Sequence, residues 1–180
     1  MSTATRHDAG GKSRPSWPSD SKVSARFSEC DQYRYELSEV WDKSKPLVLW
    51  ILMNPSVACL DYADRTLIKT GKFARSWGYG GQLIGNVHAY RTTYKNKLLD
   101  VTDPVGPKND ESLQRMAGIA KTIVLAYGQP PKKIKGRGLK VVEMLSHHPK
   151  LCYLKLAEDG TTPWHPLYLP RNLRPLPYKI

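Results

Sequence analysis

The chain has 180 residues, of which 40% are hydrophobic, and it carries a formal net charge of +12. This length suits one domain with a sizeable core, and no apolar run approaches the roughly 20 residues needed to cross a bilayer. The first residues also lack the apolar segment of a signal peptide, so the sequence predicts a cytoplasmic protein with no membrane partner.

The excess of positive charge predicts a polyanionic partner. The chain has 28 basic and 16 acidic residues, a balance that favours nucleic acid, and DNA in particular. Residues 130–140 and 169–180 contain basic residues and no acidic ones. Solubility alone, or an acidic protein partner, would also explain the charge.

The residues that usually bind metals or nucleotide cofactors show no recognisable pattern. Cys30, Cys59 and Cys152 are odd in number and lack CxxC spacing, which indicates reduced thiols. His147 and His148 have no further ligands at metal spacing. Neither a phosphate-binding loop nor a dinucleotide-binding glycine motif follows a predicted strand. We therefore expect neither a metal nor a cofactor.

The chain begins with a segment that has no hydrophobic periodicity. Residues 1–25 are rich in Ser, Gly, Pro and Lys and are predicted to form a flexible basic arm. Residues 33–41 alternate loosely and predict an edge or antiparallel strand. After a turn at residues 42–46, this strand is expected to form a hairpin with the next one.

Residues 47–53 form a continuous apolar run, typical of a central strand that is covered on both faces. The run ends abruptly at Asn54-Pro55-Ser56, because proline cannot donate a ladder hydrogen bond. Ligands of open α/β sheets bind at the carboxyl ends of strands. Asn54 is therefore predicted to contact a substrate or to orient a water. Alternatively, it hydrogen-bonds its own backbone in a plain turn.

The segment after this motif predicts a helix over residues 65–77, with apolar residues at helical spacing. Asp64 is placed to cap its first turn, and the glycines of residues 78–81 end it. Asp61 and Asp64 are therefore either helix caps or catalytic acids.

Three further strands are predicted at residues 82–90, 122–127 and 151–156. A helix follows Asn109-Asp110, which form a good N-cap, although Asp110 could instead face the site. Another helix covers 139–145. Strands that alternate with helices predict an α/β fold, a three-layer α/β/α sandwich with a mostly parallel sheet. The single domain is expected to span residues 26–170, with a basic tail at 171–180.

Right-handed crossovers would bring four strand ends to one edge of this sheet, near Asn54, Arg91, Gly128 and Trp164-His165. Tyr90, Tyr127 and Trp164 could stack there on a base. Flanking phosphates would be held by basic side chains, namely Arg91, Lys132, Lys133, Lys135 and Arg137.

Eight short motifs occur in a characteristic order along the chain: YRYELSEVWD, ILMNPS, DRT, WGYGG, NVHAYRTT, PKND, VLAYG and HPLYLP. Together they closely resemble the family called domain of unknown function 1643, which is found in bacteria and their phages. The resemblance covers residues 33–170.

A more distant resemblance connects two of these motifs with the uracil-DNA glycosylase superfamily. Residues 52–56, LMNPS, are similar to its first motif, and residues 165–168, HPLY, to its second. The resemblance implies that Asn54 positions the attacking water and that His165 stabilises the departing base. Leu167 or Tyr168 would lie in the loop that enters the duplex. Ser56 replaces a glycine of the first motif and could contact the sugar.

These observations favour a DNA glycosylase-like hydrolase that removes a damaged or modified base from DNA. Asp61 or Asp64 would supply a general base if Asn54 is insufficient. One alternative is a non-catalytic nucleic-acid-binding module on the same fold. The other is a hydrolase that acts on free nucleosides or nucleotides.

Overall fold

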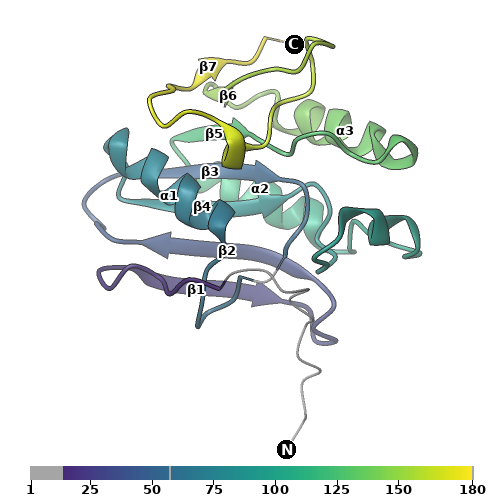
Figure 1. The fold of residues 1–180 in the computed structure, drawn as a ribbon, viewed down its shortest axis with the longest axis horizontal. Helices are drawn as coiled ribbons and strands as arrows, with labels where there is room; N and C mark the ends of the chain where they lie inside the picture. Colours follow the sequence, from purple (N-terminus) through teal and green to yellow (C-terminus); the bar gives the residue numbers. More distant parts are fainter. Residues whose placement is uncertain (1–13, 57, 180) are drawn as a thin grey trace, which may run out of the picture.

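The computed structural model describes residues 14–56 and 58–179 and contains one seven-stranded sheet (Figure 1). The strand order across the sheet is β1-β2-β4-β3-β5-β6-β7. The strands are β1 (Lys22–Phe27), β2 (Arg34–Val40), β3 (Leu47–Leu52), β4 (Gly81–Asn86), β5 (Thr122–Leu125), β6 (Leu151–Tyr153) and β7 (Leu176–Pro177).

The sheet is mixed, with a parallel core of β4, β3, β5 and β6. β1 pairs antiparallel with β2, β2 with β4, and β6 with β7. The prediction of a mostly parallel sheet is therefore correct only for its centre. The predicted hairpin between β2 and β3 is wrong, because β4 lies between them and pairs with both.

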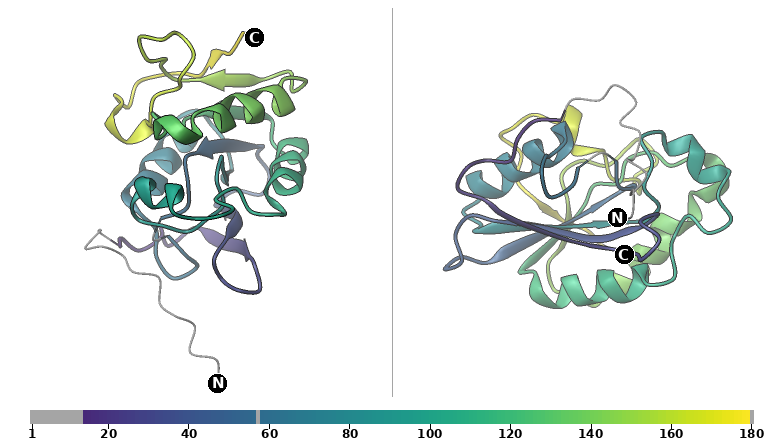
Figure 2. Two further views of the ribbon diagram at one scale, coloured as in Figure 1. Left: turned by 90° about the vertical axis from the view of Figure 1, so that its right-hand side faces the viewer. Right: turned by 90° about the horizontal axis from the view of Figure 1, so that it is seen from below.

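Helices cover both faces of the sheet (Figures 1 and 2). β3 alternates between two cores: Trp50 packs with α1 (Arg65–Ser76) on one face, while Leu49 belongs to the core formed with α2 (Asn109–Ile119) and α3 (Gly136–Leu145) on the other. This double burial explains the continuous apolar run of β3. In the part of the chain that the structure describes, three short 3-10 helices complete the fold: η1 (Lys95–Leu99), η2 (Lys132–Ile134) and η3 (Pro166–Tyr168).

Helix α1 confirms the predicted cap. The Oδ1 atom of Asp64 accepts a hydrogen bond from the Leu67 backbone N–H at 2.9 Å, which satisfies one of the unpaired donors of the first turn. The helix buries Phe73 against the sheet, and the Trp50 and Trp77 rings stack with centroids 5.5 Å apart. The cap and this aromatic contact fix where α1 begins and how it sits on β3.

Helix α2 starts differently from the prediction. Asn109 lies inside the helix, after the cap residue Lys108, and is fully buried. Its Nδ2 donates to the backbone oxygens of Asn86 (2.9 Å) and Val87 (3.3 Å). The predicted cap is therefore wrong, because the Asn109 side chain satisfies carbonyls at the end of β4 instead.

Both ends of the described chain belong to the folded domain. Residues 22–25 of the predicted arm lie in β1, and Trp17 donates from Nε1 to the Cys59 backbone oxygen at 2.9 Å. The rest of the predicted arm, residues 1–13, lies outside the described residues. In the predicted tail, β7 extends the sheet. Edge strand β1 thus spans the predicted boundary at residue 25, and edge strand β7 lies after the predicted boundary at residue 170.

Candidate functional site

A pocket of about 540 Å³ opens at the carboxyl ends of β3, β4 and β5. We call it the central pocket. Seven predicted site residues line it: Asn54, Ser56, Asp64, Tyr127, Trp164, His165 and Tyr168. Residues that follow different strands of the sheet thus line one cavity, as expected if the carboxyl ends of these strands meet at one edge.

Asn54 is held in one orientation at the end of β3. Its Nδ2 donates to the Thr92 backbone oxygen at 2.7 Å and to the Pro55 backbone oxygen at 3.1 Å. Because only the amide nitrogen can donate to two carbonyls, these bonds fix which way the amide faces. The acceptor Oδ1 is therefore the side-chain atom left to contact a water or a ligand.

His165 lies at the start of η3, half-buried in the wall of the pocket. Its Nδ1 accepts from the Leu167 backbone N–H at 3.4 Å, which places the proton of a neutral ring on Nε2. Gly128 adopts a positive φ of 67°, and a Cβ there would lie 3.1 Å from the His165 Cβ. Glycine at this position therefore lets the end of β5 approach His165 closely.

Three aromatic side chains line the central pocket at different depths. Tyr127 is 4% exposed, Trp164 40% and Tyr168 78%. The Tyr127 ring packs against Gly138 of α3, where a Cβ would lie 2.9 Å from the ring, and burial raises the pKa of its hydroxyl. The Lys155 ammonium lies 4.3 Å from the centre of the Trp164 ring. The pocket therefore offers one buried ring and two at its mouth.

The two candidate carboxylates, Asp61 and Asp64, occupy different positions relative to the central pocket. Asp64 lines the central pocket in addition to capping α1. Asp61 is exposed and does not line it. Asp64 is therefore the carboxylate placed to act on a ligand in the pocket.

Arg91 does not line the central pocket. It forms an ion pair with Asp31 at 2.5 Å, donates to the Asp31 backbone oxygen at 2.9 Å, and lies 4.8 Å from the centre of the Phe27 ring. Its side chain is 10% exposed. These contacts tie the segment after β4 to the β1–β2 connection, beside Thr92 and Thr93 of the central pocket. The role of Arg91 as a phosphate ligand stays a prediction.

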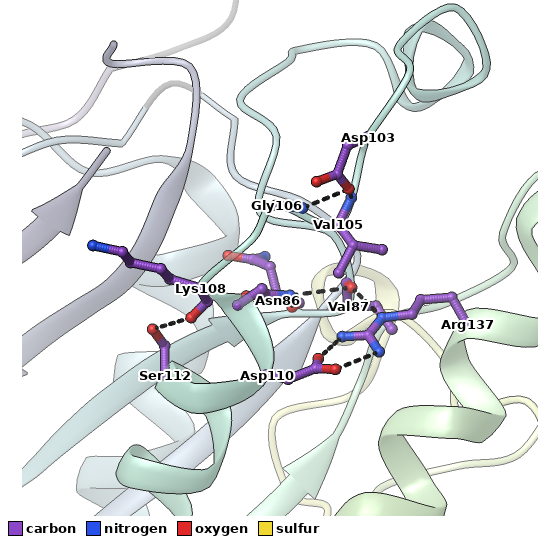
Figure 3. Close-up of polar contacts among 10 residues, drawn as sticks. Asn86, Val87, Asp103, Val105, Gly106, Lys108, Asp110, Ser112 and Arg137 are labelled. Atoms are coloured by element: carbon purple, nitrogen blue, oxygen red, sulfur yellow. Dashed lines mark hydrogen bonds and ion pairs between the residues drawn. The ribbon is translucent and has the colours of Figure 1, made fainter. Parts of the chain in front are cut away.

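Arg137 is also engaged within the protein. Its Nε donates to the Val87 backbone oxygen at 3.0 Å, and its guanidinium pairs with Asp110 (Figure 3). These contacts join α3 to the start of α2. The Asp110 side chain therefore pairs with Arg137 and does not cap α2, and Asp110 does not line the central pocket.

The remaining basic residues of this segment are Lys132, Lys133 and Lys135, which we call the lysine loop. All three are exposed and outside the central pocket. None of them pairs with a carboxylate of the described chain. Their ammonium groups are therefore available to a partner.

Four buried polar residues of the pocket were not predicted as site residues: Arg34, Asn86, Thr92 and Thr93. Arg34 and Asn86 both line it and are 2% and 1% exposed. The Nδ2 and Oδ1 atoms of Asn86 have no hydrogen-bond partner among the described residues. Asn86 ends the apolar strand β4, which is a weak sequence signal, whereas Arg34 lies between two tyrosines in a strand and carries no such signal.

Metal-binding groups do not gather in the part of the chain that the structure describes: no cluster of three or more His, Cys, Asp or Glu is present there. Cys30, Cys59 and Cys152 are free thiols. No helix among the described residues is long and apolar enough to cross a membrane.

Comparison with known proteins places this site within a family. A family model described as "Protein of unknown function (DUF1643)" matches residues 34–167. No curated protein and no solved structure matches the chain. The family match runs from Arg34 past His165 and so includes every residue that lines the central pocket except Tyr168. The chain therefore belongs to the DUF1643 family.

Proposed function

We propose that the protein is a glycosylase-like hydrolase that cleaves the N-glycosidic bond of a damaged or modified base in DNA, on a fold similar to that of uracil-DNA glycosylases. The observation that carries the proposal is the meeting of Asn54 and His165, from motifs more than 100 residues apart in the chain, in one pocket. A buried amide, Asn86, lines the same pocket.

The pocket suits a flipped nucleotide. Its volume of about 540 Å³ falls in the range of small-molecule sites. Enzymes that act on a base must first take it out of the stack and enclose it. The base and its sugar would enter between Tyr127 and Trp164, whose rings support stacking. Tyr168, which is highly exposed, would contact the neighbouring bases.

Asn54 would orient the attacking water. With its amide N–H groups bound to the Thr92 and Pro55 carbonyls, its Oδ1 can accept a hydrogen bond from that water. Asp64 lines the same pocket and supplies a carboxylate that could take up the proton. Ser56 lies two residues after Asn54 and would contact the sugar.

His165 and Asn86 would act on the base. In its neutral form, His165 carries a proton on Nε2, which can stabilise the charge that develops on a departing base. Asn86 offers one donor group and one acceptor, both without a partner among the described residues. The donor and the acceptor of the Asn86 amide match the edge of a base in which a carbonyl stands beside an N–H group.

The lysine loop would hold the phosphates on either side of the flipped nucleotide, since such contacts position a protein on DNA without reading sequence. Arg91 and Arg137 would keep the neighbouring loops in place through Asp31 and Asp110.

A second candidate function is nucleic-acid binding without catalysis. It is favoured by the position of the lysine loop, which is exposed and lies outside the central pocket. Binding through these lysines would depend on salt but not on Asn54 or His165. Activity on free nucleosides would show little salt dependence.

The test is release of a base from a panel of single-stranded and duplex DNAs that carry uracil, 5-hydroxymethyluracil, 5-hydroxymethylcytosine and other modified pyrimidines. Abasic sites are detected by alkaline cleavage. We expect release from at least one substrate and a loss of about 100-fold in His165→Ala. His147→Ala, an exposed histidine outside the pocket, is the matched control. Tight, salt-sensitive binding with no release from any substrate would replace the proposal by the binding function.

A further inference from the structure

Arg34 is a buried cation at the wall of the central pocket. It is the first residue of β2, and the residue is 2% exposed. Its Nη1 donates to the Ala58 backbone oxygen at 2.9 Å, while its buried Nε has no partner among the described residues. Unlike Arg91 and Arg137, it forms no ion pair with a described carboxylate.

A charge in this position is costly to the folded protein. Moving a guanidinium out of water without a paired anion costs several kcal/mol in general, which is why buried charges are almost always paired. Burial lowers the pKa of Arg34 to about 10, so it stays charged at neutral pH. Asp64 offsets this through its negative charge, but it lies beyond ion-pair distance and caps α1.

Two neighbouring groups favour an anion beside Arg34. Thr66, in the first turn of α1, lines the same pocket, and helix N-termini carry a partial positive charge. The Ser56 hydroxyl also lines the pocket and is buried without a partner among the described residues. The Asp64 carboxylate would repel an anion, so the preference of the pocket for an anion depends on the positive charge of Arg34.

We infer that Arg34 is the binding residue for an oxyanion of the ligand in the central pocket. A guanidinium is planar, presents several N–H donors and fits phosphate or an anionic carbonyl oxygen. The choice between these two sources rests on the proposed function: the oxyanion is either a phosphate of the flipped nucleotide or the oxygen of the departing base.

The first experiment measures the melting temperature in increasing inorganic phosphate, with sodium chloride adjusted to hold the ionic strength constant. We expect phosphate to stabilise the wild type and to bind Arg34→Met at least tenfold more weakly. Arg115→Met removes a half-exposed arginine outside the pocket and should respond like the wild type. Equal responses of Arg34→Met and the wild type, or no response of the wild type, would overturn the inference.

Stability without phosphate gives a second readout. Because Arg34→Met removes a buried charge that has no ion pair, we expect it to melt at or above the wild-type temperature. If Arg34→Met does not fold, Arg34→Lys takes its place, since it keeps the charge but loses the planar donors and should still weaken phosphate binding.

A comparison of thymidine 5′-monophosphate with thymidine then identifies the source of the oxyanion. A preference for the nucleotide that Arg34→Met loses assigns Arg34 to phosphate. Equal binding of both, with slower base release by Arg34→Met, assigns it to the departing base. Phosphate binding that depends on Arg34, in a protein that releases no base, would support the inference and contradict the proposed function.

Discussion

The two ends of the parallel strands differ in how their polar groups are used. At the amino end, the turn between β2 and β3 is tightly bonded: the Gly80 N–H donates to the Pro46 oxygen, and the Trp41 and Asp42 N–H groups donate to the Gly80 oxygen, all at 2.9 Å. At the carboxyl end, buried atoms of Arg34, Ser56 and Asn86 lack partners among the described residues, and near the amino end of β4 the Gln82 Oε1 also lacks one.

This difference agrees with a stabilising role for the amino end and with the binding role that we propose for the carboxyl end. Backbone hydrogen bonds and the Trp41 indole, which donates to the Tyr79 oxygen at 2.9 Å, close the amino end. Buried polar groups without partners cost free energy, so a cluster of them beside a pocket favours a ligand that supplies the missing hydrogen bonds. The six residues of β3 connect the hydrogen-bonded amino end to the central pocket at the carboxyl end.

The largest expected effect on stability is at the amino end. A Cβ at Gly80 would lie 1.9 Å from the Asp42 backbone oxygen, so Gly80→Ala should lower the free energy of unfolding by about 3 kcal/mol. Urea denaturation measures this change. Gly118→Ala is the control: Gly118 lies in α2 with no atom within 4 Å of an added Cβ, and this change should stabilise the protein by about 0.5–1 kcal/mol. Equal stability of the two variants would contradict the close packing of this end.

A smaller effect is expected on DNA binding, and it should be greater when lysines are removed at the carboxyl end of the sheet than at the amino end. Replacing Lys132, Lys133 and Lys135 by Met should weaken DNA binding about tenfold at low salt, because the lysine loop follows the carboxyl end of β5. It should also reduce the slope of log K against log[salt] by as much as about 0.9 for each phosphate that the variant no longer neutralises. Fluorescence anisotropy at several salt concentrations measures both.

The matched control for this variant removes the same charge at the amino end. Lys43 and Lys45 precede β3, Lys121 precedes β5, and all three are exposed. Their replacement by Met should leave most of the affinity intact. If both triple variants lose the same affinity, the binding comes from net charge alone and the carboxyl end has no special role.

The sequence was most informative where a pattern is local. The apolar run of β3, the Asp64 cap and the polar residues after each core strand predicted the centre of the sheet and seven residues of the central pocket. These features depend on neighbouring residues in the chain, and their physical rules apply before any tertiary contact forms.

Features that depend on distant contacts were missed. β1 alternates Val23, Ala25 and Phe27 with polar residues, but this short pattern lies at the end of a segment without other periodicity. β7 consists of two exposed residues and carries no hydrophobic pattern. The turn at residues 42–46 does not determine whether β2 pairs with β3 or with β4, so the position of β4 beside β2 could not be predicted from it. Whether Arg34 is unpaired while Arg91 and Arg137 are paired depends on which carboxylate lies beside each in space.

The most direct test of the central claim is the single-turnover rate of base release by Asn54→Ala, on whichever DNA the wild type cleaves. The rate should fall at least about 100-fold, because the water loses the acceptor that orients it. Asn96→Ala, an exposed asparagine of η1 outside the central pocket, should keep the wild-type rate. A folded Asn54→Ala protein that releases the base as fast as the wild type would contradict the role of this pocket in catalysis.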